Sequence, residues 1–162
     1  MIPADDRPVT AYIGLGANLG DARRTVRQAV QDLGTLPQTR LMRASSLYRT
    51  APIDSSGPDY INAVAEVATT LSPQALLTEL QRLELAAGRE RPYRNAPRTL
   101  DLDILLYDDI ALDMPTLTIP HPRMVDRAFV LLPLAEIAPH RLGAQQLDAV
   151  RGQAIERLPP DG

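Results

Sequence analysis

The pattern of apolar and polar positions divides residues 9–107 into six regular elements. It predicts strands over 9–15, 40–48, 60–69 and 97–107 and helices over 22–33 and 73–88. The order strand, helix, strand, strand, helix, strand is a split βαβ pattern. We therefore expect an α+β, ferredoxin-like βαββαβ sandwich, in which helices pack on a mostly antiparallel sheet.

Capping residues mark both predicted helices. We expect Asp21 as the N-cap of the first helix and Ser72, followed by Pro73, as the N-cap of the second. Gly34 and Gly88 are expected to end them. The buried stripes should consist of Val26, Ala29, Val30 and Leu33 in the first helix, and of Leu76, Leu80, Leu83 and Ala87 in the second.

The remaining chain predicts helical additions to this sandwich. One or two short helices are expected over 124–138, broken at Pro133. Their core residues should be Phe129, Val130, Leu132, Leu134 and Ile137. A length of 162 residues indicates one domain over 1–162, with 1–8 and 158–162 as loose ends.

The segment 97–107 carries the most distinctive chemistry. In a strand, Asp101 and Asp103 share one face, while Leu100, Leu102, Ile104 and Leu106 share the other. Two neighbouring carboxylates repel each other, so their face needs a compensating charge. Carboxylate oxygens are ligands that Mg²⁺ prefers, and Mg²⁺ held by few carboxylates completes its shell with water and substrate phosphates.

Glycines at positions 14, 16 and 20 allow two interpretations. Their spacing faintly resembles a dinucleotide-binding loop, but a plain strand-to-helix turn before Asp21 is favoured. A dinucleotide-binding fold also needs more βα units than this length provides.

Composition narrows the chemistry. All 17 basic residues are arginine, so a Schiff-base lysine and the lysine-containing phosphate loop are excluded. There is no cysteine and there are two histidines, which excludes thiol nucleophiles and multi-histidine metal sites. The residue types that are left suit phosphoryl transfer. The absence of cysteine, of a signal peptide and of any apolar run near ~18 residues predicts a cytoplasmic protein with no membrane contact.

A proline-broken loop, 89–98, holds four arginines and one glutamate, although the net charge of the chain is −3. A charge run is usually a solvated loop. Because this one leads directly into the aspartate strand, we favour anion binding, for which the arginine fork matches phosphate.

Three further residues are candidates for ligand contact. Tyr60 and Asn62 share a strand face, and a flat ring beside an amide suits a planar heterocycle. An ordinary strand with an edge tyrosine is an equally open interpretation. His121 is held between two prolines and is a better candidate than His140, which we expect to be structural or solvated.

Several blocks, in order over residues 9–139, resemble the 6-hydroxymethyl-7,8-dihydropterin pyrophosphokinase family. They are 97–104 (PRTLDLDI), 12–20 (YIGLGANLG), 46–52 (SLYRTAP), 58–63 (PDYINA), 81–84 (QRLE), 88–89 (GR) and 119–122 (IPHP). The resemblance implies transfer of the terminal diphosphate of ATP to the hydroxymethyl group of the pterin, in the folate pathway. It also implies two Mg²⁺ ions and ATP as co-substrate.

The same resemblance implies roles for individual residues. Asp101 and Asp103 would hold metal, and Arg89, Arg91 and Arg98 would complete the catalytic set. The ATP-binding positions would be Gln81, Glu84, Arg89, Arg98, Ile104, Thr118, His121 and Arg127. The pterin-binding positions would be Thr50, Ala51, Pro52, Ile53, Tyr60, Asn62, Asp101 and Phe129, with Tyr60 and Phe129 sandwiching the ring.

Two other function classes fit part of this sequence. A metal-dependent sugar-nucleotide transferase also uses an Asp-x-Asp motif, but the length and the multi-block resemblance argue against it. A ferredoxin-like RNA-binding domain uses exposed aromatics and basic charge, which one Phe, no Trp and an isoelectric point near 5.3 support poorly. We expect a monomer that binds ATP and the pterin but no nucleic acid.

Overall fold

The structure, a computed structural model, describes residues 7–18, 20–51, 59–88 and 100–159. The main sheet contains β1 (Val9–Ala17), β2 (Thr39–Ala44), β3 (Tyr48–Thr50), β4 (Tyr60–Thr69), β5 (Asp101–Tyr107) and β8 (Glu156–Arg157). The strands lie in the order β5, β1, β4, β3, β8, and β2 lies beside β3 along the same edge of β4. Every pairing is antiparallel, as predicted. A separate hairpin joins β6 (Leu112–Met114) to β7 (Leu117–Ile119).

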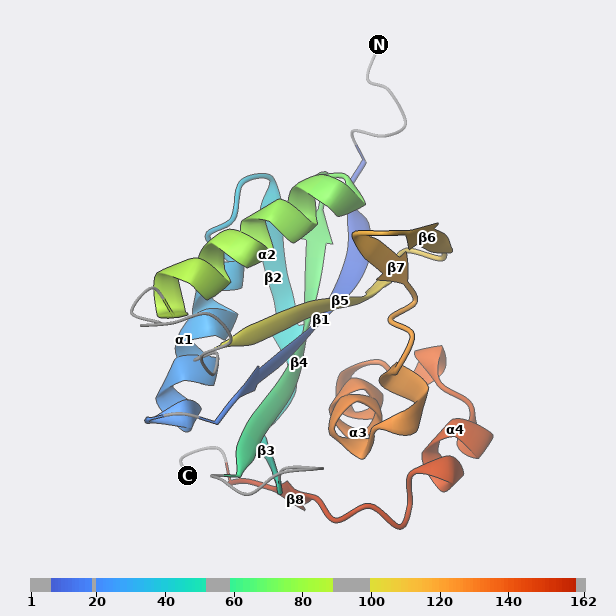
Figure 1. Ribbon diagram of the computed structural model, residues 1–162. Helices are drawn as coiled ribbons and strands as arrows, with labels where there is room; N and C mark the ends of the chain where they lie inside the picture. The colour runs from blue at the N-terminus through green and yellow to red at the C-terminus, as the bar shows by residue number, and fades with distance from the viewer. Residues whose placement is uncertain (1–6, 19, 52–58, 89–99, 160–162) are drawn as a thin grey trace.

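Helices cover both sides of this sheet. They are α1 (Ala22–Leu33), α2 (Pro73–Gly88), α3 (Ala128–Ile137) and α4 (Ala144–Ala149), with short 3₁₀ turns at Met124–Asp126 and Pro139–Arg141. Figure 1 shows α1 and α2 on one side of the sheet and α3 and α4 on the other. Contacts of α1 with β1 and β4, of α2 with β5, and of α3 with β3 and β4 agree with this arrangement. The predicted α+β, ferredoxin-like class is confirmed.

The boundaries of the first two helices are also confirmed. The Asp21 carboxylate accepts a hydrogen bond from the Arg24 backbone N–H at 3.2 Å, and the Ser72 hydroxyl accepts one from the Ala75 N–H at 3.1 Å. Both bonds satisfy backbone donors that a helix start leaves without a partner. The expected burial of Ala87 is wrong: residues 85–87 are exposed, so the last turn of α2 extends past the core.

Each face of the sheet has its own core. Beneath α1 and α2 lie Ala11, Ile13, Leu15, Ile61, Ala63, Val67, Leu102, Ile104 and Tyr107. On the other face, Tyr12, Val64, Leu105 and Leu106 pack with the apolar residues of α3. Five of the residues proposed from the sequence also stand on this second face: Thr50, Tyr60, Asn62, Asp101 and Asp103.

A bulge in β5 explains one error of the sequence prediction. Tyr12 lies opposite Leu106 and Ile13 opposite Ile104, so Leu105 is an extra residue in β5. The extra residue reverses the alternation of side chains beyond it. Leu106 therefore packs beneath α3, and the prediction that it shares a face with Leu102 and Ile104 is wrong.

The predicted strand over 40–48 is instead two strands. Ala44 lies opposite Ala65 and Tyr48 opposite Asn62, so three residues stand against two of β4. At the interruption, the Ser45 hydroxyl accepts the hydrogen bond of the Val64 N–H at 2.9 Å. A side chain thus replaces a backbone acceptor, and the ladder resumes at β3.

The expected loose end at 158–162 is wrong at its first residue. Leu158 is only 3% exposed, and its N–H donates a hydrogen bond to the Leu47 carbonyl at 2.8 Å. Just before it, β8 pairs with β3. Residues 1–6 and 160–162 lie outside the described residues.

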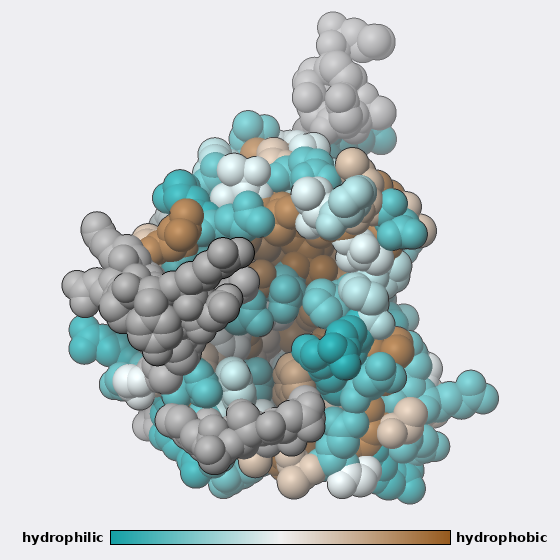
Figure 2. All heavy atoms as spheres, in the orientation of Figure 1, coloured by the Kyte–Doolittle hydropathy of each residue, from teal (hydrophilic) through white to brown (hydrophobic). Residues whose placement is uncertain are grey.

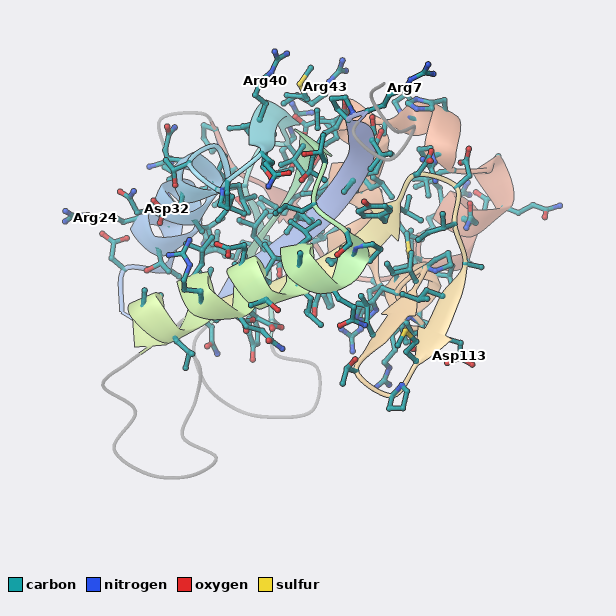
Figure 3. The ribbon with its side chains drawn as sticks, turned by 90° about the horizontal axis from the view of Figure 1, so that it is seen from above. Arg7, Arg24, Asp32, Arg40, Arg43 and Asp113 are labelled. Carbon is teal, nitrogen blue, oxygen red and sulfur yellow. The ribbon has the colours of Figure 1, made fainter. Side chains whose placement is uncertain are left out.

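Charged side chains line the outer rim of the molecule. Arg24 and Asp32 on α1, Arg40 and Arg43 on β2, and Asp113 on β6 point outward in Figure 3. None of the helices in the described ranges is both long enough and apolar enough to cross a membrane.

Candidate active site

The two aspartates lie at the start of β5, each opposite a glycine. Asp101 is paired with Gly16 and Asp103 with Gly14 on the neighbouring strand β1. Asp101 is exposed and Asp103 is half-buried, and both stand on the face that carries α3. No β1 side chain separates the carboxylates from the next strand. In Figure 2, hydrophilic side chains gather between β5 and α3.

Asn62 lies on the far side of these glycines. Gly16 is paired with Asn62 on β4 as well as with Asp101 on β5, and Asn62 is paired with Tyr48 on β3. The sheet therefore aligns Asp101, Gly16, Asn62 and Tyr48 in one row, although the sequence spreads them over more than 80 positions.

The Asn62 side chain has a fixed orientation. It is only 5% exposed, and its amide nitrogen donates a hydrogen bond to the Thr50 hydroxyl at 3.0 Å. A Cβ atom at Gly16 would lie 3.1 Å from the Asn62 amide oxygen, so that oxygen is directed toward the glycine. The structure thus brings together Thr50 and Asn62, two of the residues for which the resemblance implies pterin binding.

The glycines at 14 and 16 do not belong to a turn. Both lie inside β1, which extends to Ala17, and only Gly20 adopts a positive φ, of 58°. The favoured interpretation as a strand-to-helix turn is therefore wrong for Gly16, whereas Gly14 lies in the strand predicted over 9–15. Their physical role is the close approach of Leu105 and Asn62 to the β1 backbone.

We expect Gly16→Ala to displace the Asn62 amide, because the added methyl would lie too close to its oxygen. If Asn62 binds the pterin, as the resemblance implies, the affinity for the pterin should fall about tenfold. Calorimetric titration measures the change. Gly34→Ala is the matched control, because its φ of −72° suits alanine and its new Cβ would meet Leu41 at an ordinary 3.4 Å. Equal affinities of Gly16→Ala and the parent protein would contradict this assignment.

His121 faces the aspartates from the segment after β7. Its Nε2 lies 3.9 Å from an Asp103 carboxylate oxygen, and its backbone N–H donates to the Leu105 carbonyl at 3.0 Å. Nδ1 accepts a hydrogen bond from the Arg123 N–H at 3.2 Å, which leaves the proton on Nε2. Burial lowers the pKa of His121, helped by Arg127 and Arg123 and opposed by Asp101. The ring thus presents a neutral N–H donor toward Asp103.

Glu84 fixes the outer edge of β5. Its carboxylate accepts the Leu102 backbone N–H at 2.8 Å, which ties the aspartate strand to α2. Ile104 has a side chain that is 2% exposed in the core beneath α1 and α2, so only its backbone can face a ligand. Of the other predicted ATP positions, Gln81 is exposed on α2 and Thr118 is half-buried on β7.

The start of α3 brings two more predicted residues together. The Arg127 guanidinium lies 5.2 Å from the centre of the Phe129 ring, a cation–π distance. Phe129 is half-buried beside the α3 core, whereas Tyr60 is 39% exposed at the start of β4. Ala51 is exposed directly after β3. Pro52, Ile53, Arg89, Arg91 and Arg98 lie outside the described residues.

Sequence reasoning missed Glu136 and Tyr48. The Glu136 carboxylate accepts hydrogen bonds from the Tyr48 hydroxyl at 2.8 Å and from the Ser46 N–H and hydroxyl at 3.0 Å. Burial, with the contribution of Glu136, raises the pKa of Tyr48 to about 12, so this hydroxyl remains a donor. The available signal was a single glutamate within the apolar run 128–138.

The donor set on β5 fits a hard cation that retains other ligands. No group of three or more His, Asp or Glu side chains suited to a metal exists within the described part of the chain. Two carboxylates on one strand face, without a closed protein cage, match the way in which Mg²⁺ shares its shell with water and phosphate. The geometry as a whole is that of an α+β protein in which one sheet face carries two carboxylates and a buried amide, with Tyr60 on the same face and Phe129 on the helix that packs there.

Comparison with known proteins gives the family. The model of the 7,8-dihydro-6-hydroxymethylpterin-pyrophosphokinase family matches residues 12–139. The 2-amino-4-hydroxy-6-hydroxymethyldihydropteridine pyrophosphokinase of Pseudomonas aeruginosa is 44% identical over 155 residues, covering 91% of this chain and 96% of that protein. The enzyme of the same name from Haemophilus influenzae is 47% identical, covering 80% of this chain and 82% of its own. The chain belongs to this family, and the resemblance stated from the sequence is confirmed.

Solved structures agree on the fold. A Plasmodium falciparum HPPK-DHPS chain, crystallised with pteroate, superposes with a TM-score of 0.64 at 15% identity. The match covers 80% of this chain and 39% of that one, so the present chain spans about two fifths of the solved protein. At this identity the likeness concerns the fold alone.

Proposed function

We propose that this chain transfers the diphosphate of ATP to the hydroxymethyl group of 6-hydroxymethyl-7,8-dihydropterin, giving AMP and the pterin diphosphate for folate biosynthesis. Family membership supports the reaction, and the names of the relatives supply the acceptor. The observation that carries the proposal is the row of Asp101, Gly16 and Asn62, in which a carboxylate strand and a buried amide share one face.

Asp101 and Asp103 are the residues that would hold Mg²⁺, and we propose two ions. When bound, Mg²⁺ supplies Lewis-acid neutralisation of phosphate charge and a template for the substrates. Carboxylates are suited to this because their oxygens stand on one exposed strand face. His121 supports the pair, since its Nε2–H faces the Asp103 carboxylate at 3.9 Å and adds a favourable dipole beside that charge.

The pterin is expected to bind along β3 and β4, between Tyr60 and Phe129. The Asn62 nitrogen is engaged by Thr50, so the Asn62 oxygen is the atom that we assign to accept a hydrogen bond from the heterocycle. Aromatic side chains favour stacking with a flat ring. Ala51, Pro52 and Ile53 would contribute contacts from the segment after β3, and Asp101 would contact the hydroxymethyl group.

ATP is expected to bind along the outer edge of β5. Gln81 and Glu84 on α2, the Ile104 backbone, Thr118, His121 and Arg127 form this proposed set. Arg89, Arg91 and Arg98 are proposed to bind the phosphates, because guanidinium groups match their geometry and the chain has no lysine. Positioning and charge neutralisation would then supply most of the catalysis.

Nucleotide analysis tests the proposal. The purified protein is incubated with ATP, Mg²⁺ and the hydroxymethyl-dihydropterin, and the nucleotides are separated by ion-exchange chromatography. AMP should accumulate only when the pterin is present, and chelation of Mg²⁺ by EDTA should stop it. Formation of ADP, or of AMP at an equal rate without pterin, would refute the proposed reaction.

A further inference from the structure

Residues 153–158, called the strap below, connect two elements that are otherwise distant in the chain. The strap leaves the α4 region, runs beneath α3 and ends as β8 on the outer edge of β3 (Figure 1). One end thus lies at the start of α3, which carries Phe129. The other lies at β3, which carries Thr50 and neighbours Asn62.

At its first end, the strap completes the start of α3. Arg127 occupies the N-cap position but makes no side-chain capping bond. Gln153 supplies one instead: its amide oxygen accepts the Ala128 N–H at 2.9 Å, and its amide nitrogen donates to the Asp126 carbonyl at 2.7 Å. Ala128, the residue before Phe129, is therefore held by Gln153, which lies 25 positions later in the chain.

At its second end, the strap meets β3 through side chains as well as backbone. Arg157 is paired with Tyr48 in the ladder, and its guanidinium donates to Glu136 at 3.3 Å and to the Ser46 hydroxyl at 3.1 Å. Glu136 in turn accepts from Ser46 and Tyr48. Because Glu136 lies on α3, this network joins the strap, α3 and β3 at one point.

The contribution of Arg157 to the stability of the fold does not by itself explain this network. The Arg157 side chain is 61% exposed, and exposed ion pairs contribute little to the free energy of folding. Its contacts do constrain geometry, because one guanidinium bridges a helix residue and a strand residue. A fixed distance between α3 and β3 matters most for a ligand that touches both.

We propose that the strap, through Gln153 and Arg157, is a positioning device that holds α3 at a fixed distance from β3 and β4 and so tunes pterin affinity. The inference builds on the proposed function, which assigns Phe129 to one wall of the pterin site and Thr50 with Asn62 to the other. The proposed ATP residues on β5 and α2 make none of the contacts described for the strap, whereas Arg127 lies between the two residues that Gln153 binds. We therefore expect changes at the β3 end of the strap to leave ATP affinity unchanged.

The test compares equilibrium binding of the two substrates. Gln153→Ala, Arg157→Ala and Glu136→Gln are titrated with the hydroxymethyl-dihydropterin in the presence of a non-hydrolysable ATP analogue and Mg²⁺, and separately with that analogue alone. Each variant should raise the pterin Kd roughly fivefold, since each loses one or two hydrogen bonds. The Kd of the analogue should stay unchanged in Arg157→Ala and Glu136→Gln, whereas Gln153→Ala also releases the residues on either side of Arg127, which belongs to the proposed ATP set. Arg157→Lys should recover part of the pterin affinity.

Two controls separate positioning from general stability. Arg151→Ala removes an exposed ion pair with Asp148 on α4, next to the strap but outside it. Val26→Ala thins the core beneath α1 and lowers the melting temperature without touching the strap. An unchanged pterin Kd in Gln153→Ala, Arg157→Ala and Glu136→Gln would overturn the positioning role. A rise in the pterin Kd of Val26→Ala equal to theirs would overturn it as well.

The outcome also distinguishes this inference from the proposed function. If Asn62→Ala weakens pterin binding while the strap variants do not, the strap inference alone fails. If the parent protein does not bind the pterin at all, the proposed function fails first. If Glu136→Gln does not fold, Arg157→Ala still tests the positioning role. The Arg157 side chain is mostly exposed, so its removal should leave the protein folded.

Discussion

Replacement of Asp103 by asparagine, or of Asp101 by asparagine, should lower kcat at least about 10³-fold. Each substitution keeps the shape of the side chain but removes one of the two negative charges proposed to hold Mg²⁺ at the start of β5. The effect should appear at saturating ATP and pterin, because the lost interaction serves the transfer step. Steady-state kinetics with AMP as the measured product gives the number.

The fold should survive both changes. Two like charges on one strand face oppose each other, so the loss of one does not remove a stabilising contact between them. Asp32→Asn is the matched control, since Asp32 is a half-buried residue of α1, away from β5, whose carboxylate accepts a local bond from Gln28. Calorimetry measures the affinity for Mg²⁺ in the presence of the ATP analogue. This affinity should fall in the Asp101 and Asp103 variants and stay unchanged in Asp32→Asn. Retention of more than a tenth of the parent kcat would refute the metal role.

Asn62→Ala should raise the pterin Kd about 10- to 100-fold and leave the Kd of the ATP analogue unchanged. The substitution removes the amide that we propose accepts from the pterin, and it leaves the Thr50 hydroxyl without its partner at 3.0 Å. Phe129→Ala should act in the same direction, because it removes one wall of the proposed sandwich. Calorimetric titration of each substrate separates the two effects.

Thr39→Val is the matched control for Asn62→Ala. Thr39 is also buried, and its hydroxyl is bonded to that of Thr69 at 2.8 Å, so this change breaks a comparable pair of side chains. The pair lies at the opposite end of β4 from Asn62. A larger loss of ATP affinity than of pterin affinity in Asn62→Ala would contradict the assignment of this residue.

The local features of the fold were predictable because their causes lie within a few residues. Asp21 and Ser72 cap helices whose first N–H groups are three positions away. The exact extent of β4 followed from its own run of β-branched and apolar residues. Such signals need no knowledge of the tertiary structure.

The bulges could not be predicted, because their causes are distant in the sequence. Leu105 is an extra residue only in relation to β1, and the break after Ala44 exists only in relation to β4. The roles of Gly14 and Gly16 also depend on neighbouring strands, and Gly16 resembled a turn residue for this reason. Their role becomes visible once Leu105 and Asn62 approach from neighbouring strands.

The candidate site divides in the same way. The face shared by Asp101 and Asp103 followed from strand alternation alone, whereas the alignment of Asp101 with Asn62 needed two strand registers. Glu136 and the two-residue strand β8 left almost no local pattern. Both contact Ser46 and Tyr48, which lie about 90 positions before Glu136 and about 110 positions before β8.

The measurement that tests the central claim most directly is the mass of the pterin product after a single turnover. Protein in excess over the hydroxymethyl-dihydropterin is mixed with ATP and Mg²⁺, quenched with acid at successive times and analysed by mass spectrometry. The pterin should gain two phosphoryl groups in one step, in equal amount to AMP, and Asp103→Asn should leave it unmodified over the same time. A singly phosphorylated pterin, or an unmodified pterin beside newly formed AMP, would contradict diphosphate transfer at this site.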